Sequence, residues 1–132
     1  MTAGYSGTPQ LKKLGIVEGV RLDVVGADPA WRFEADPVGV ERVGEDAPAD
    51  VVVAFCRTPA DVENAVAAAG PRIRPAGVLW IAWPRKAAGH VSEVTENLLR
   101  DIALPLGLVD VKVAAVDADW SGLKLVWRRE NR

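Results

Sequence analysis

A run of apolar residues near the middle of the chain limits the folds that this sequence can adopt. The run covers residues 78–83, follows Gly77 and is stopped by Pro84. A short apolar run bounded by Gly and Pro, with helical patterns on either side, is typical of a strand buried on both faces. Such strands occur in α/β proteins, where helices cover a parallel sheet. The run therefore predicts the central strand of an α/β sheet.

Similar patterns predict the other strands. Each is a period-two or wholly apolar segment between turn residues. The predicted strands cover residues 20–25, 38–43, 51–56, 78–83, 109–117 and 123–129. The segment 38–43 is brief and is expected at an edge, and residues 118–122 form the hairpin turn between the last two strands. Alternation in the first hairpin strand predicts an inward set of Val109, Val111, Val113 and Ala115.

Capping signals predict the helices. Asp28 before Pro29, and Thr58 before Pro59, are typical of helix N-termini, and Gly15 and Gly70 are typical of helix ends. The predicted helices cover residues 11–15, 29–35, 59–69 and 92–103. The last of them places Val94, Leu98, Leu99 and Ile102 on its buried stripe.

This order of elements predicts the fold class. Strands that alternate with helices form a mostly parallel sheet, and the last two strands add a C-terminal antiparallel hairpin. We therefore expect an α/β three-layer sandwich that is Rossmann-like but truncated. Residues 1–132 are predicted to form a single domain, with residues 1–18 as an N-terminal arm that packs on it.

Composition excludes several classes of function. The chain has 132 residues, of which 49% are hydrophobic and 26% charged, as in soluble globular domains. A net charge of −2 argues against binding to nucleic acid or to an anionic membrane surface. The N-terminus has no apolar signal segment, and the single cysteine, Cys56, cannot form an internal disulfide. We expect a cytoplasmic protein.

The strongest candidate site is cationic and aromatic. Trp83, Arg85 and Lys86 follow the central strand, and Arg57 follows strand 51–56, next to the helix start at Thr58. Ligands of open α/β sheets bind at the carboxyl edge, where these strands end, and cations with helix amides suit a phosphate or a carboxylate. The arm would close over this edge with Tyr5, Ser6, Lys12 and Lys13. The alternative is that the tryptophan packs in the core and the cations are solvated.

Other chemistry is less well supported by the sequence. Arg57 and the adjacent helix start are able to depress the pKa of the Cys56 thiol, whereas a buried and inert cysteine is the more common outcome. His90 is the only histidine, and the topology permits it to meet Cys56 at one sheet edge. One His and one Cys without further ligands do not make a zinc site. Asp117 is expected as an exposed hairpin charge or as a partner of Arg85 or Lys86.

The segment from Asp50 to Arg129 resembles the second half of a class I methyltransferase in its order of elements. That resemblance implies a methyltransferase-like fold and a nucleotide-derived cofactor, S-adenosylmethionine. The first half differs from that family, because no glycine-rich loop follows Gly26, and Asp23 lies within the first strand instead of beyond a second one. Methyl transfer is therefore kept as an alternative function.

A second resemblance covers most of the chain. Its motifs are Gly4-Tyr-Ser-Gly-Thr-Pro9, Leu11-Lys-Lys-Leu-Gly15, Leu79-Trp-Ile-Ala-Trp-Pro-Arg-Lys86, Gly107-Leu-Val-Asp-Val-Lys-Val113 and Asp119-Trp-Ser-Gly-Leu123. Together they are similar to a family of small bacterial proteins catalogued as domain of unknown function 3052. This resemblance implies no activity, cofactor or catalytic residue.

Three functional hypotheses follow. The first is a non-enzymatic module that binds a small anionic ligand or a protein partner at the carboxyl edge. The second is an adenosylmethionine-dependent transferase with an unconventional cofactor pose. The third is an oligomerisation or protein-interaction module, of which a homodimer is one form. Exposed indoles such as Trp31 or Trp120 would form its interface.

Overall fold

The computed structural model describes residues 9–132 and contains one six-stranded sheet. The strands are β1 Arg21–Val25, β2 Glu41–Arg42, β3 Val51–Phe55, β4 Val78–Pro84, β5 Leu108–Ala115 and β6 Trp120–Trp127. Their order in the sheet is β2-β1-β3-β4-β6-β5. The first four run parallel, and β6 lies antiparallel between β4 and β5. The predicted mixed sheet with a C-terminal hairpin is confirmed.

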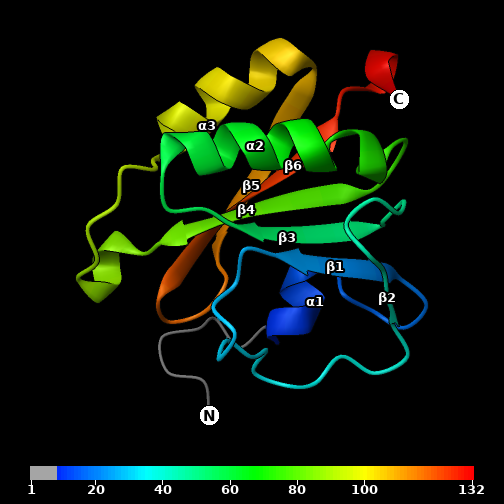
Figure 1. The fold of residues 1–132 in the computed structure, drawn as a ribbon, viewed down its shortest axis with the longest axis horizontal. Coiled ribbons are helices and arrows are strands. Elements are labelled where there is room, and N and C mark those ends of the chain that lie inside the picture. Colours follow the sequence, from blue (N-terminus) through cyan, green and yellow to red (C-terminus); the bar gives the residue numbers. More distant parts are fainter. Residues whose placement is uncertain (1–8) are drawn as a thin grey trace.

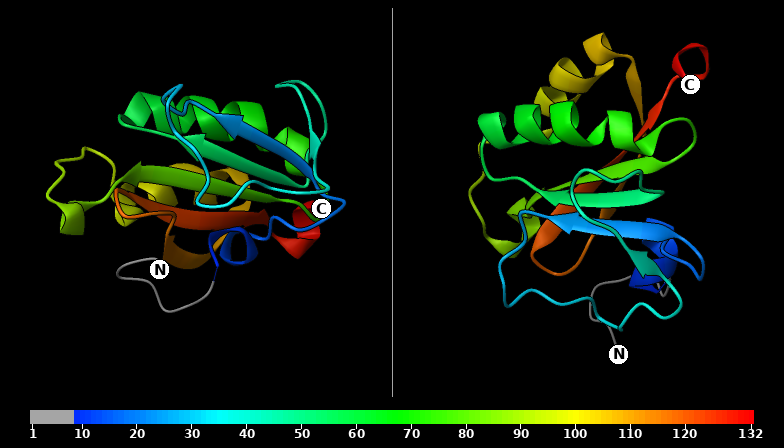
Figure 2. Two further views of the ribbon diagram at one scale, coloured as in Figure 1. Left: turned by 90° about the horizontal axis from the view of Figure 1, so that it is seen from below. Right: turned by 45° about the vertical axis from the view of Figure 1, so that its right-hand side comes forward.

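Helices cover the two faces of this sheet unequally. α2 (Pro59–Ala69) and α3 (Glu96–Ala103) pack on one face, and the short α1 (Gln10–Leu14) packs on the other. Figure 1 shows α2 and α3 above the sheet, and Figure 2 shows α1 on the side opposite α2. Irregular chain between β1 and β2 completes the cover on the α1 face. The fold is thus a three-layer α/β sandwich with one thin layer.

The central strand β4 is buried along almost its whole length. Leu79 and Ile81 lie in the core under α2 and α3, and Trp80 and Ala82 lie in the core on the α1 face. Trp80 is fully buried, and its indole N–H donates to the Leu14 carbonyl oxygen at 3.0 Å. This bond ties α1 to the sheet. The prediction of a strand buried on both faces is confirmed.

The helix predicted over residues 29–35 is wrong. The Asp28 carboxylate accepts a hydrogen bond from the Ala30 amide at 2.8 Å, which closes a single turn instead of capping a helix. Beyond it, Trp31 and Phe33 both pack into the core on the α1 face. Side chains two residues apart share a face only in extended chain, so their burial excludes a helix here.

Two other boundaries differ from the prediction. α3 begins at Glu96, with Thr95 as its cap, because Ser92 accepts a hydrogen bond from the Val94 amide in a separate turn. β6 begins at Trp120, within residues 118–122, for which the sequence predicts the hairpin turn. The β2 strand is shorter than residues 38–43 but lies at the sheet edge as expected.

The inward set predicted for the first hairpin strand is also wrong. A register shift between Asp110 and Lys112 inserts an extra residue, so the alternation reverses there. Val111 is 53% exposed and Val113 is 45% exposed, whereas Leu108 is fully buried. Asp110 turns toward α3, where Arg100 Nε lies 2.9 Å from its carboxylate.

No helix in the described residues is long and apolar enough to cross a membrane.

Gly77 makes β4 possible by a close approach of backbones. A Cβ at this position would lie 2.8 Å from the Ile73 carbonyl oxygen and 2.9 Å from that of Ala49. We therefore expect Gly77→Ala to lower the free energy of unfolding by about 1–3 kcal/mol, since these oxygens belong to backbone that must shift. Urea denaturation measures this change.

Gly44→Ala is the matched control, because a Cβ at Gly44 meets nothing within 4 Å. The control should change the free energy of unfolding by less than about 0.5 kcal/mol. Equal effects of the two variants would contradict the packing argument.

Candidate functional site

An open pocket lies at the carboxyl end of β4, on the face covered by α3. Its volume is about 520 Å³. The walls come from the end of β4, the turn that follows it, the start of α3 and the first residues of β6. They comprise Trp83, Pro84, Arg85, Lys86, Ala87, His90, Val91, Ser92, Val94, Thr95, Glu96 and Ser121. We call this the edge pocket. It brings together three residues of the predicted site, namely Trp83, Arg85 and Lys86.

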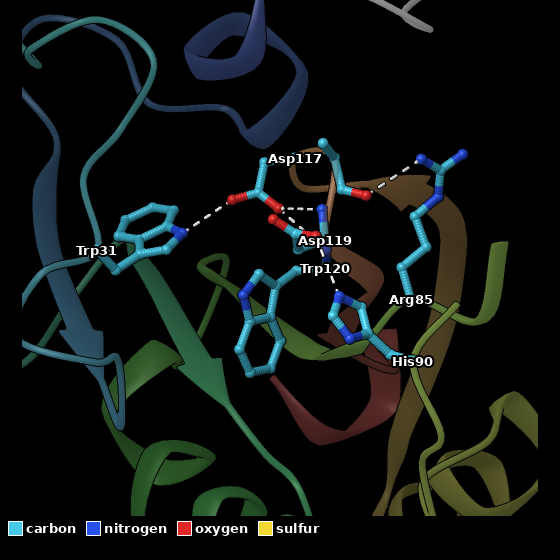
Figure 3. Close-up of polar contacts among 7 residues, drawn as sticks. Trp31, Arg85, His90, Asp117, Asp119 and Trp120 are labelled. Atoms are coloured by element: carbon cyan, nitrogen blue, oxygen red, sulfur yellow. Dashed lines mark hydrogen bonds and ion pairs between the residues drawn. The ribbon is translucent and has the colours of Figure 1, made fainter. Parts of the chain in front are cut away.

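The turn of the β5–β6 hairpin lies beside the edge pocket and is organised by Asp117 (Figure 3). One carboxylate oxygen accepts from the amides of Asp119 and Trp120, at 2.8 and 2.9 Å. The other accepts from the Trp31 indole N–H at 2.9 Å. Asp117 thus fixes both the turn and the loop after β1. The expected pairing of Asp117 with Arg85 or Lys86 is absent among the described residues.

The turn after β4 is held against the same hairpin. The Arg85 amide donates to the Asp119 carbonyl oxygen at 2.8 Å, and its guanidinium lies 3.5 Å from the Ala118 carbonyl oxygen. His90 Nε2 lies 3.0 Å from the Asp119 carboxylate (Figure 3). These contacts fix the position of the residues that line the edge pocket on this side.

Aromatic side chains fill the sheet edge next to the hairpin. Phe55 packs against Trp31 and Trp120, with ring centroids 4.8 Å apart in each pair. The Arg57 guanidinium lies 5.0 Å from the centre of the Trp120 ring, which suits a cation–π contact. Arg57 therefore belongs to this aromatic cluster, and it does not line the edge pocket as the predicted site required.

The helix start at Thr58 already holds an anion of the chain itself. The Asp61 carboxylate accepts from the amides of Arg57 and Thr58 at 2.9 and 3.1 Å, and the Thr58 hydroxyl accepts from the Asp61 amide. The Arg57 amide in particular holds the pKa of Asp61 below its ordinary value. The capping box of Thr58 and Asp61 forms at the predicted helix start. Its hydrogen bonds use the amides of Arg57, Thr58 and Asp61, which are amides that the predicted site offered to a ligand.

Neither Lys12 nor Lys13 of the arm lines the edge pocket. Lys12 is exposed on α1, across the sheet from α3. Lys13 donates from Nζ to the Ala115 carbonyl oxygen at 3.0 Å, and burial lowers the pKa of Lys13. Tyr5 and Ser6 lie outside the described residues, so their expected role stays a prediction.

The thiol of Cys56 is not activated. Its side chain is 1% exposed, and burial raises the pKa of the thiol to about 12. The direction of this shift is opposite to the depression proposed for Arg57, and the cysteine is buried as the alternative expected. Cys56 lines a different pocket from His90, between β1 and α2. Within residues 9–132 no cluster of ligating side chains suits a metal ion.

Several residues of the site were not identified from the sequence. Ser92, Thr95 and Ser121 line the edge pocket, and Asp119 holds His90. The spacing Asp-x-Asp-Trp at the hairpin indicates the role of Asp117. An Asp that precedes a turn commonly accepts a hydrogen bond from the backbone amide two residues further on. No local signal placed Ser121 opposite Trp83, because that pairing depends on the register between β4 and β6.

With the geometry established, comparison with solved structures identifies the fold. Fibrillarin, a pre-rRNA processing protein of Methanococcus jannaschii, matches with a TM-score of 0.56 and 13% identity, over 85% of this chain and 68% of that one. An Aeropyrum pernix fibrillarin with natively bound S-adenosyl-L-methionine matches with a TM-score of 0.55 and 16% identity, over 89% and 73%. The fold is that of the class I methyltransferases.

A further match supports this assignment. A SAM-dependent methyltransferase from Aquifex aeolicus has a TM-score of 0.55 and 14% identity, over 87% of this chain and 86% of that one. No protein-family model and no curated protein matches the sequence. Identities this low establish a shared Rossmann-like architecture, whereas function depends on the site that each protein builds on it.

The residues after β1 do not fit an adenosyl cofactor in the arrangement that the fold family implies. Gly26 follows β1 with φ 74°, and a Cβ there would lie 2.7 Å from the Phe55 carbonyl oxygen. Within the described part of the chain no helix follows before β2, so the N-terminal amides that hold an anionic group in such folds are missing. Trp31 and Phe33 cover this face instead.

The high pKa of Cys56 predicts a thiol that reacts slowly in the folded protein. Thiol reagents attack the thiolate, and a pKa of about 12 leaves almost none of it at pH 8. We expect labelling by a chromogenic disulfide reagent to follow the rate of unfolding and to become complete in concentrated urea. Rapid stoichiometric labelling under native conditions would contradict the assignment of an inert cysteine.

Asp117 should contribute more to stability than its neighbour in the turn. Asp117→Ala leaves the Trp31 indole N–H and two turn amides without their acceptor, so we expect a loss of about 1–3 kcal/mol in urea denaturation. Asp119→Ala is the matched control, because the contact of its carboxylate within residues 9–132 is with an exposed His90. The control should cost less than about 1 kcal/mol. Similar losses would show that Asp117 does not organise the edge.

Proposed function

We propose that this protein is a non-enzymatic module that binds a small anionic ligand in the edge pocket. The observation that carries the proposal is the convergence of Arg85, Lys86 and His90 on one open pocket at the carboxyl edge of the sheet. In open α/β sheets this edge is where ligands bind. Compared with the site predicted from the sequence, the proposed site adds His90 and omits Arg57, Thr58 and Lys12.

The electrostatics of the pocket support an anion over a cation. Among the described residues of its wall, Glu96 is the acidic one, and Arg100 Nη2 lies 3.0 Å from the Glu96 carboxylate. The pocket also lies at the N-terminal end of α3, where the helix dipole is positive. Lys86 is exposed, and no carboxylate pairs with it among residues 9–132.

Two features support binding without catalysis. The His90 ring lies at the surface with 44% of its side chain exposed, so it is poorly shielded from water. The other candidate nucleophile, Cys56, is buried outside the edge pocket. The proposal also includes membership of the family catalogued as domain of unknown function 3052. The motifs at 79–86 and 119–123, which carry that resemblance, both contribute residues to the edge pocket.

An adenosylmethionine-dependent transferase is the second candidate, because one solved neighbour of the same fold holds S-adenosyl-L-methionine. An adenosyl ligand would use the pocket of about 360 Å³ at the end of β1, which Gly26, Cys56 and Ala68 help to line. Ala68→Trp would fill that pocket from the exposed side of α2. Ala67→Trp is its matched control, as Ala67 is exposed on the same helix and lines neither pocket.

The main argument for the interaction-module hypothesis was exposed tryptophan side chains, and the described residues do not provide them. Trp80, Trp83 and Trp127 are buried, and Trp31 and Trp120 are half-buried in the aromatic cluster. No tryptophan of the described chain is thus an exposed anchor for an interface. A homodimer stays a prediction.

Thermal unfolding in the presence of candidate ligands tests the proposed function. A ligand at a hundredfold excess over its dissociation constant stabilises the folded state by about 2.7 kcal/mol, which raises the Tm of a domain of this size by about 10 °C. We expect such a shift with small carboxylates or phosphates and a smaller shift for Lys86→Ala. Lys12→Ala, which removes an exposed lysine on the other face, should behave as the wild type.

The results separate the two candidate functions. A shift with adenosyl compounds that Ala68→Trp abolishes and Lys86→Ala leaves intact would overturn the binding-module proposal in favour of the transferase. If Lys12→Ala weakened binding as much as Lys86→Ala, the effect would be one of overall charge, and the edge pocket would not be the site.

A further inference from the structure

We infer that the edge pocket selects a monocarboxylate with an apolar body over a phosphate or another multiply charged anion. This inference rests on the proposed function and adds the chemical class of the ligand. It follows from three properties of the wall: an apolar surface, a lysine ammonium group without a partner among residues 9–132 and an indole N–H without an acceptor there.

Apolar side chains form the inner wall. Trp83 is 8% exposed and Val94 is 2% exposed, and both also belong to the core between the sheet and the helices. Pro84 and Ala87 also line the pocket with apolar atoms. A multiply charged anion would lose hydration against such a wall without compensating hydrogen bonds, whereas an aliphatic or aromatic body gains from leaving water.

One cation of the edge pocket has no partner among the described residues. The Arg85 guanidinium lies by the Ala118 carbonyl oxygen on the hairpin, and His90 is held by the Asp119 carboxylate. Lys86 is the cation of the described wall that has neither a carbonyl nor a carboxylate partner among residues 9–132. Arg85 keeps its positive charge beside the hairpin, and the Lys86 ammonium group is the cation left to pair with a ligand carboxylate.

Trp83 lines the edge pocket and carries an indole N–H donor. The indoles of Trp31, Trp80 and Trp127 each donate to a named acceptor at 2.8–3.0 Å. The N–H of Trp83 has no acceptor among residues 9–132, and its nitrogen is not among the atoms sealed from solvent. Because Trp83 lines the edge pocket, a ligand oxygen there can supply the missing acceptor.

Register places a hydroxyl beside this indole. Ser121 pairs with Trp83 across the antiparallel strands β4 and β6, so the two side chains lie on the same face of the sheet, and both line the pocket. An indole N–H, a serine hydroxyl and an ammonium group are donors enough for two carboxylate oxygens. The inner wall then accommodates the rest of the ligand.

The test uses hexanoate as the probe, with hexanamide as the uncharged molecule of the same shape and inorganic phosphate as the competing anion. Titrations of the full chain are followed in the indole region of a ¹⁵N–¹H correlation spectrum, in which Trp83→Phe identifies the Trp83 peak. We expect hexanoate to shift the Trp83 peak saturably and to leave the Trp80 and Trp127 peaks in place. Hexanamide and phosphate should not shift it at the same concentrations.

Two variants locate the head group. Lys86→Ala should weaken hexanoate binding about threefold, as expected for one exposed ion pair, and Lys12→Ala should not change it. Since Trp83→Phe alters a buried side chain, its fold is checked by the unchanged positions of the other indole peaks. Ser121→Ala provides a second test of the pocket wall and should also weaken binding.

The outcomes separate this inference from the proposed function. Phosphate binding that Lys86→Ala weakens, without hexanoate binding, would overturn the monocarboxylate class and leave the anion-binding module intact. Equal binding of hexanoate and hexanamide would show that the charge is not recognised and would overturn the inference. If neither anion shifted the Trp83 peak at millimolar concentrations, both the inference and the proposed function would be wrong.

Discussion

Burial of β4 on both faces is the constraint on which the rest of this structure depends. The strand pairs in parallel with β3 and antiparallel with β6, so it joins the Rossmann-like half of the sheet to the hairpin. Its side chains belong alternately to the two cores. Backbone groups of such a strand are satisfied only by neighbouring strands, which is why both neighbours must form. Where the strand ends at Pro84, the chain must leave the interior and reach solvent.

The exit of β4 creates the candidate site because the hairpin stops beside it. Asp117 gathers two turn amides and the Trp31 indole, and Arg85 and His90 then attach the turn after β4 to this fixed point. The pocket wall is therefore built on connected backbone rather than on a free loop. Sites held this way need little ordering on binding, which favours recognition of a small ligand.

The chain shares the fold of the class I methyltransferases but has no helix between β1 and β2 in its described part. In place of a helix after β1 it has an extended loop whose Trp31 and Phe33 cover the α1 face. Two aromatic rings exclude water from this face as a helix would, but they present no row of amides to an anionic cofactor. Shared architecture does not by itself imply a shared use of the carboxyl edge.

The sequence by itself determined the strands and helices whose patterns are strongly periodic or capped. The apolar runs at β3 and β4 and the Thr58 cap of α2 are local signals, and propensity and burial agree in them. It also placed Trp83, Arg85 and Lys86 at one edge, since the carboxyl ends of parallel strands meet there. Only tertiary structure decided the loop at Trp31, the bulge that turns Val111 outward and the capture of the Thr58 amides by Asp61. Each of these depends on which distant group lies opposite, and that is set by sheet register and core packing, not by neighbours in the chain.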